Sequence, residues 1–260
     1  VWNSAEIYGG ATDEIVVDPQ QPETVYAVTH DVGLFRSDDG GGGWDFKLAG
    51  GVYGTRNLAV DPVSPTVLYM FAPWVLHRSE DHGDTWTPLE TPGKMTFPHP
   101  TDSGTLFASN RWEGQSGLWR SDDYGETWIT KTTGLTNSLV NNLAYDPADP
   151  DTIYVGTEPG NIFVSSDGGD HWSFVDHPLP YIMTLAINPR GDHELWATNS
   201  CFDQTPTTLR STNASHTDWE PVPGAAGSMP LTTIAFAPSA WGAAYSKTVV
   251  VADCWDEVLR

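Results

Sequence analysis

Short runs of alternating apolar and polar residues recur along the chain and predict β-strands. One run in each segment is rich in β-branched and aromatic residues, as in Thr24-Val25-Tyr26-Ala27-Val28. A period of two is typical of strands with one buried face. A corner such as Val17-Asp18-Pro19 or Val60-Asp61-Pro62 precedes each run, and six corners of this kind occur. Because no helical period interrupts the series, the pattern predicts an all-β chain.

A polar turn sequence recurs at a nearly constant spacing between two strands of each segment. Its copies begin at a serine and end at a tryptophan, and these tryptophans are Trp44, Trp86, Trp128, Trp172 and Trp219. They lie 42, 42, 44 and 47 residues apart, and roughly 40–50 residues is the length of one four-stranded propeller blade. Ser and Asp side chains can close such a turn through backbone amides, and glycine supplies a positive φ.

The second copy, Ser79-Glu80-Asp81-His82-Gly83-Asp84-Thr85-Trp86, resembles the Asp-box, or BNR repeat. The chain is similar to the Asp-box β-propellers, a group that includes sialidases, sortilin-type receptors and xyloglucan-hydrolysing enzymes. This resemblance, together with the six corners, predicts an all-β, six-bladed β-propeller with four-stranded antiparallel blades and Asp-box turns.

The sixth repeat stops at its third strand, Glu257-Val258-Leu259-Arg260, whereas Val1-Trp2-Asn3-Ser4 reads like a fourth strand. Closure removes exposed sheet edges from a propeller. We therefore predict one domain, residues 1–260, with the N-terminal strand in the last blade. A fragment of a longer array is the alternative.

The charge balance excludes several classes of partner. Lys and Arg total 12 against 34 Asp and Glu, which gives a net charge of −22. Such a surface repels phosphate backbones and anionic lipids, so we expect no nucleic-acid partner. No run of 18 apolar residues occurs, so no membrane insertion is expected. Because Val1 begins directly in strand-like sequence, we expect a mature, secreted, extracellular chain.

No cofactor or metal is expected. The eight histidines lack the spacing of zinc ligands, and no calcium-loop spacing or phosphate-binding loop is present. Cys201 and Cys254 occupy similar positions in neighbouring repeats. A disulfide between them and two buried thiols both stay open.

The loops that follow the second strands and enter the first strands are expected to gather on one face of a propeller, where ligands bind. They are rich in aromatic, amide and carboxylate side chains, a combination that suits sugar rings and their hydroxyls. Channel-plugging aromatics are the alternative. The predicted substrate-binding residues are His30, Arg56, Trp74, Arg111, Trp112, Glu113, Tyr181, Asp203, Trp255 and Asp256.

Arginine counting argues against a sialidase. A sialidase needs three arginines that converge on a carboxylate. The recurring arginines that precede the turns are expected to be structural, and Arg190 is expected on the opposite face. That leaves only Arg56 and Arg111.

The segment Thr29-His30-Asp31-Val32-Gly33 resembles a stretch in the first repeat of two-propeller xyloglucanases. The resemblance implies a catalytic carboxylate at Asp31, and in that family the second carboxylate comes from another propeller. Within one six-bladed ring, the matching loop opposite carries Glu158, and an inverting hydrolase needs carboxyl groups roughly 6.5–9.5 Å apart. The alternative is that Asp31 caps a loop or accepts a sugar hydroxyl.

Three functions therefore stay open. The first is a secreted propeller that binds a glycan or polysaccharide on the central face. The second is a glycoside hydrolase of xyloglucanase type that uses Asp31 and Glu158. The third is a sortilin-type propeller that binds a protein or peptide. Whether the chain is an enzyme is left open by the sequence.

Overall fold

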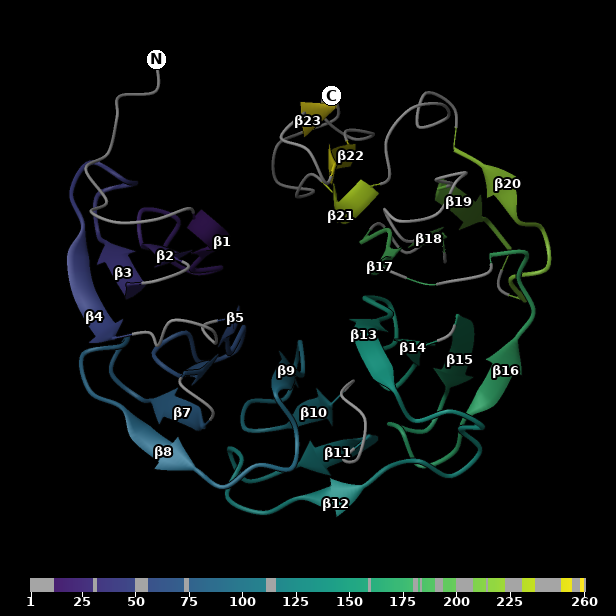
Figure 1. Ribbon diagram of the computed structural model, residues 1–260, viewed down its shortest axis with the longest axis horizontal. Helices are drawn as coiled ribbons and strands as arrows, with labels where there is room; N and C mark the ends of the chain where they lie inside the picture. Colours follow the sequence, from purple (N-terminus) through teal and green to yellow (C-terminus); the bar gives the residue numbers. More distant parts are fainter. Residues whose placement is uncertain are drawn as a thin grey trace. The chain divides into compact units, whose positions relative to one another are not determined.

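The computed structural model describes residues 12–29, 32–49, 56–72, 75–110, 116–158, 160–179, 182, 184–189, 194–199, 208–213, 215–222, 231–236, 249–253 and 258–259. Every regular element within these residues is a β-strand, and the strands form antiparallel sheets (Figure 1). Five sheets have four strands and one has three. The all-β prediction is confirmed, as is the prediction of four-stranded repeats.

The chain divides into two compact units. The first comprises Val1–Asn110 and Leu118–Thr130, and the second comprises Arg111–Gly117 and Lys131–Arg260. Three sheets lie in each unit, and in every sheet the strands pair in chain order.

The sheets of the first unit are β1(Thr12–Val17)–β2(Val25–Thr29)–β3(Gly33–Ser37)–β4(Asp45–Ala49), then β5(Arg56–Val60)–β6(Leu68–Phe71)–β7(Leu76–Ser79)–β8(Thr87–Leu89), then β9(Met95–Pro98)–β10(Leu106–Asn110)–β11(Gly117–Ser121)–β12(Ile129–Thr130). We number the repeats by these sheets, so that repeat 1 contains β1–β4.

The sheets of the second unit are β13(Val140–Tyr145)–β14(Ile153–Thr157)–β15(Asn161–Ser165)–β16(Ser173–Val175), then β17(Thr184–Ile187)–β18(Leu195–Thr198)–β19(Thr208–Ser211)–β20(Glu220–Pro221), then β21(Leu231–Phe236)–β22(Val249–Asp253)–β23(Val258–Leu259). The sixth repeat thus has three strands among the described residues. The predicted N-terminal strand, 1–7, lies outside them.

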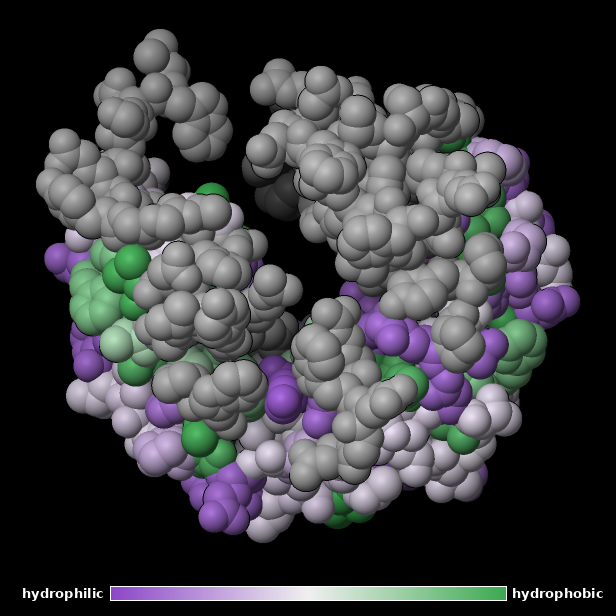
Figure 2. All heavy atoms as spheres, viewed as in Figure 1, coloured by the Kyte–Doolittle hydropathy of each residue, from purple (hydrophilic) through white to green (hydrophobic). Residues whose placement is uncertain are grey.

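The hydrophobic core lies between neighbouring sheets. In the first unit, Val28 and Leu34 of repeat 1 pack with Leu58, Leu68 and Met70 of repeat 2. Trp86, the last residue of the second turn, packs against this cluster. On the face shown in Figure 2, the described hydrophobic residues are dispersed among hydrophilic ones. Each sheet therefore depends on its neighbour to bury its apolar face.

One position in the first strand of each repeat shows this dependence. The residue two positions before the corner is at most 8% exposed in five repeats, where it is Leu58, Thr96, Leu143, Leu185 or Ile234. Ile15 occupies the same position in repeat 1 and is 64% exposed. Val17, two residues further along β1, is 49% exposed. The face of the repeat 1 sheet that carries Ile15 and Val17, called its outer face below, is therefore apolar. No described residue of its unit covers this face.

Candidate functional site

Most of the predicted site residues lie outside the described residues. These are His30, Asp31, Trp74, Arg111, Trp112, Glu113, Tyr181, Asp203, Trp255 and Asp256, and the same holds for Cys201 and Cys254. Arg56 is the first residue of β5, and only its backbone is described. Their roles stay predictions.

Glu158 directly follows β14 in a hydrogen-bonded loop. Its backbone amide donates to the carbonyl of Leu139 over 2.9 Å, and its carbonyl accepts from Asn137 Nδ2. Asn137 Oδ1 in turn accepts from the amide of Leu139 over 2.9 Å. Hydrogen bonds therefore hold the backbone at the half-buried Glu158 in place. A carboxylate that accepts a hydrogen bond from a sugar hydroxyl or transfers a proton needs such a fixed position.

Asn141, in the neighbouring strand β13, has a structural role. Its side chain is 5% exposed, and Nδ2 donates to the carbonyl of Ile182 over 2.8 Å. It lies at the bulge between Val140 and Asn142, where the register of β13 against β14 shifts. We conclude that Asn141 joins repeat 4 to repeat 5. A similar bulge occurs near the start of β1, β5 and β21, where the loops that enter these strands on the predicted binding face end.

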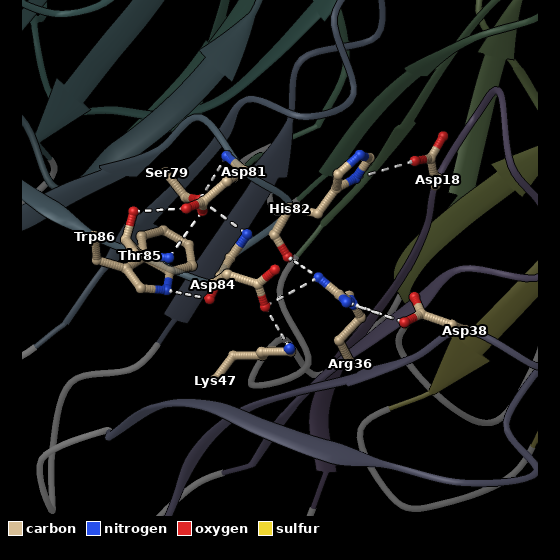
Figure 3. Close-up of polar contacts among 11 residues, drawn as sticks. Asp18, Arg36, Asp38, Lys47, Ser79, Asp81, His82, Asp84, Thr85 and Trp86 are labelled. Carbon is tan, nitrogen blue, oxygen red and sulfur yellow. Dashed lines mark hydrogen bonds and ion pairs between the residues drawn. The ribbon is translucent and has the colours of Figure 1, made fainter.

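The repeated turn has the same hydrogen bonds in four copies. In repeat 2, Ser79 Oγ donates to Asp81 Oδ1 over 2.8 Å and accepts from the amide of Gly83 over 2.8 Å (Figure 3). Asp81 Oδ1 also accepts from the amide of Thr85 over 2.8 Å. The equivalent serine–aspartate distances are 2.7–2.8 Å in the copies that contain Asp39, Asp123 and Asp167.

A glycine is needed at one position of this turn. Gly83 has φ +89°, a conformation that L-residues avoid, and a Cβ there would come within 3.3 Å of Leu68 and Trp86. The turn residues thus position the tryptophan that packs between sheets.

These turns lower the pKa of their aspartates. Burial alone would raise the pKa of Asp81, but hydrogen bonds from the Thr85 hydroxyl and amide and from Ser79 hold it at about 2. The amide and ring of His171, with Ser165, lower the pKa of Asp167. Each carboxylate therefore stabilises the folded state in its ionised form.

We predict that acid destabilises the protein through these turns. A folded pKa below the unfolded value of about 4 gives stability that is complete above pH 4 and is lost as pH falls toward 2. Thermal unfolding followed by circular dichroism should show a midpoint that is steady near pH 6 and drops between pH 4 and 2. The Asp81→Asn variant should show a lower midpoint at pH 6 and a shallower drop. Parallel profiles for the variant and the parent would contradict the assignment.

The recurring arginines that precede the turns form ion pairs. Arg36 Nη1 donates to the carbonyl of His82 over 2.9 Å, and Nη2 contacts Asp38 at 3.0 Å (Figure 3). Asp84 accepts from Arg36 at 3.4 Å and from Lys47 Nζ at 2.5 Å. Arg78 repeats the arrangement with the carbonyl of Tyr124 and the carboxylate of Glu126. These two arginines connect one repeat to the next, so their role is structural.

A hollow of about 530 Å³ lies beside this network in the first unit. It is lined by Gln21, Pro22, Glu23, Thr24, Arg36, Asp38, His82 and Asp84. Two of its carboxylates, Asp38 and Asp84, already pair with Arg36. We interpret it as a groove between two repeats. Among the described residues, no group of three His, Cys, Asp or Glu side chains could hold a metal ion.

The fifth copy of the turn is built differently, which the sequence did not reveal. Ser211 Oγ donates to Asp218 Oδ1 over 2.6 Å, seven residues along the chain. Because Ser211 gives its only proton to Asp218, His216 Nδ1 donates to Ser211 Oγ, 3.2 Å away. His216 Nε2 then accepts from the hydroxyl of Tyr154 at 2.7 Å. The signal in the sequence is the aspartate placed directly before Trp219.

Comparison with known proteins places this architecture among propellers. The family model for Sortilin, neurotensin receptor 3 matches residues 116–234. Xyloglucanase Xgh74A of Acetivibrio thermocellus is 29% identical over 244 residues, which cover 72% of this chain and 29% of that enzyme. The chain therefore spans less than a third of the length of this relative.

Solved structures show the same fold at low identity. An ancestral GH74 enzyme superposes with a TM-score of 0.69 and 21% identity over 83% of this chain and 31% of that one. YCF48 bound to D1 peptide superposes with a TM-score of 0.68 and 14% identity over 96% of this chain and 77% of that one. These matches indicate a propeller-type repeat fold. No helix in the described part of the chain is long and apolar enough to cross a membrane.

Proposed function

We propose that the six repeats form a six-bladed propeller, that their turns are Asp-boxes, and that the N-terminal strand completes the last blade within one domain. Three observations support this proposal. Six sheets follow in chain order, the sixth has three described strands, and the outer face of repeat 1 exposes Ile15 and Val17. A closed ring would cover that face with the sheet of repeat 6.

We further propose that the protein is secreted and binds a neutral polysaccharide of the xyloglucan class on the face formed by the second-strand loops. The observation that carries this proposal is the similarity to a xyloglucanase over 72% of the chain. The predicted binding residues, from His30 to Asp256, are proposed to contact sugar through aromatic faces and through amide or carboxylate groups. The hydrogen bonds that hold the loop of Glu158 in place also favour this face as the binding site.

Hydrolysis is the second candidate, and the xyloglucanase relatives favour it. In this proposal, Asp31 acts as one acid or base and Glu158 as its partner. A chain that covers 29% of its relative could instead require a further domain for the second carboxylate. Peptide binding is the competing function, which the sortilin match and the peptide-bound structural neighbour favour.

One pair of assays separates binding from hydrolysis. We expect the parent to bind a xyloglucan oligosaccharide in isothermal titration calorimetry. If Asp31 is catalytic, Asp31→Ala should bind the oligosaccharide with an affinity within about threefold of the parent. Its rate of reducing-sugar release should fall at least about 100-fold, the usual scale of acid–base catalysis. Glu158→Gln should lose a similar share of this activity.

The outcomes are distinct. Absence of sugar release from the parent would leave the binding function and remove hydrolysis. Absence of oligosaccharide binding would remove both glycan proposals. Peptide binding in its place would establish the competing function.

A further inference from the structure

A row of aromatic rings follows the outer strands of repeats 4 and 5 in the second unit, and its histidine, His177, contacts the backbone of Gly160 in the loop of Glu158. Phe174 on β16 is 56% exposed and meets the buried ring of Phe163 edge-to-face, with centroids 5.9 Å apart. His177 follows at 6.3 Å from Phe174, and Trp219 follows at 6.3 Å from His177. We name Phe174, His177 and Trp219 the aromatic ledge.

The ledge is held rigidly from below. Trp219 Nε1 donates to the carbonyl of Asp176 over 2.9 Å, and its ring packs against the core cluster of repeats 4 and 5. The amide of Leu179 donates to His177 Nδ1 over 3.2 Å. Hydrogen bonds to the backbone therefore fix the orientation of the Trp219 and His177 rings. Because these side chains are already ordered, binding does not lose free energy by ordering them.

The charge of the ledge suits a neutral ligand. Burial lowers the pKa of His177, an effect that the neighbouring Asp176 and a hydrogen bond with the backbone of Gly160 partly oppose, so the neutral ring is favoured at pH 7. The exposed residues Asp176 and Glu220 are the chain neighbours of His177 and Trp219, and Glu220 pairs with Arg210 at 2.7 Å. Carboxylates accept hydrogen bonds from hydroxyl groups but repel acidic polymers, and the net charge of −22 adds to that repulsion.

Repeat 1 offers an incomplete copy of the same arrangement. Phe46 occupies the position of Phe174, is 53% exposed and lies 5.5 Å from Phe35. However, β4 contains one extra residue at a bulge against β3, so the position of His177 falls on Gly50, which has no ring to continue the row. An exposed phenylalanine on the outer strand therefore does not make a ledge by itself.

We propose that the aromatic ledge is a second contact site for a neutral polysaccharide, which binds pyranose rings on the rim of repeats 4 and 5. The proposal rests on the proposed glycan-binding function and extends it to a polymer longer than the loop face alone would hold. Ring faces cover the C–H side of each sugar, and Asp176 accepts its hydroxyls. An acidic polymer is the alternative that the charge excludes.

The test compares Phe174→Ser with its matched control, Phe46→Ser. Both variants remove an exposed ring that lies on a buried phenylalanine, so their thermal midpoints should fall by similar amounts. In native gels at pH 7 that contain xyloglucan polymer, Phe174→Ser should show an apparent affinity about tenfold weaker than the parent, the scale of one aromatic contact. Phe46→Ser should migrate like the parent.

The remaining outcomes all decide the question. Equal retardation of the two variants overturns the ledge, and so does stronger retardation of the parent by polygalacturonate than by xyloglucan. A parent that no neutral polysaccharide retards overturns it as well. Calorimetry with a short xyloglucan oligosaccharide tests the loop face separately. If all three proteins bind the oligosaccharide but show equal retardation by the polymer, only the ledge fails.

Discussion

Replacement of Ile15 by aspartate is expected to lower the free energy of unfolding by about 3 kcal/mol, because a closed ring would bury this side chain. The same position is at most 8% exposed in the five other repeats, against 64% for Ile15. A carboxylate placed between two sheets loses both the apolar burial and its own hydration. Urea unfolding followed by tryptophan fluorescence measures the change.

Ile129→Asp is the matched control. Ile129 is 61% exposed but belongs to the outer strand β12, which closure leaves at the rim. Its replacement should change stability by about 0.5 kcal/mol or less, as is usual for surface positions. Equal effects of the two variants would contradict closure of the ring over β1.

Asp61→Ala is expected to lower the free energy of unfolding by about 3–5 kcal/mol, because a buried carboxylate that binds two repeats is lost. Asp61 is 1% exposed, and Oδ1 accepts from the amides of Val63 and Ser64 at 2.9 and 3.0 Å. Oδ2 accepts from Ser103 Oγ at 2.9 Å and from the amide of Gly104 at 3.2 Å, both in repeat 3. Urea unfolding measures this loss too.

Asp18 provides the internal comparison. It fills the same corner in repeat 1, is fully buried, and its Oδ1 accepts from the amides of Gln20 and Gln21. Its Oδ2 has no hydrogen-bond partner and lies 4.0 Å from His82 Nδ1. Asp18→Ala should therefore cost only about 1–2 kcal/mol. A larger loss for Asp18 than for Asp61 would show that the bonds to the next repeat contribute little.

The repeat architecture could be predicted from the sequence because each turn carries its own chemistry. Ser79, Asp81 and Gly83 close their turn through bonds to residues at most four positions away. Local interactions of this kind leave a readable spacing in the chain. The four-stranded sheets follow from the same period, since each strand has a fixed offset from the turn.

The interactions between repeats could not be predicted in the same way. Asp61 and Ser103 are 42 residues apart, and nothing in either local pattern shows that they meet. The aromatic ledge likewise depends on how β16 and Trp219 pack. In the fifth turn, Asp218 replaces the usual aspartate from the far end of the loop, which an expectation based on position misses.

The predicted binding face is the part that the sequence constrains least. Its loops carry the chemistry, but loop conformation depends on contacts that no period encodes. Glu158 is the one predicted site residue whose surroundings the structure describes, and its loop is braced through Asn137 and Leu139. Asn141, in the same region, is instead a buried link between repeats.

Calorimetric titration of the 260-residue protein with a xyloglucan oligosaccharide tests the central proposal most directly. We predict saturable binding that Trp112→Ala weakens and Phe46→Ser leaves unchanged. Heats no larger than those of dilution, with saturable binding of a peptide in their place, would contradict it.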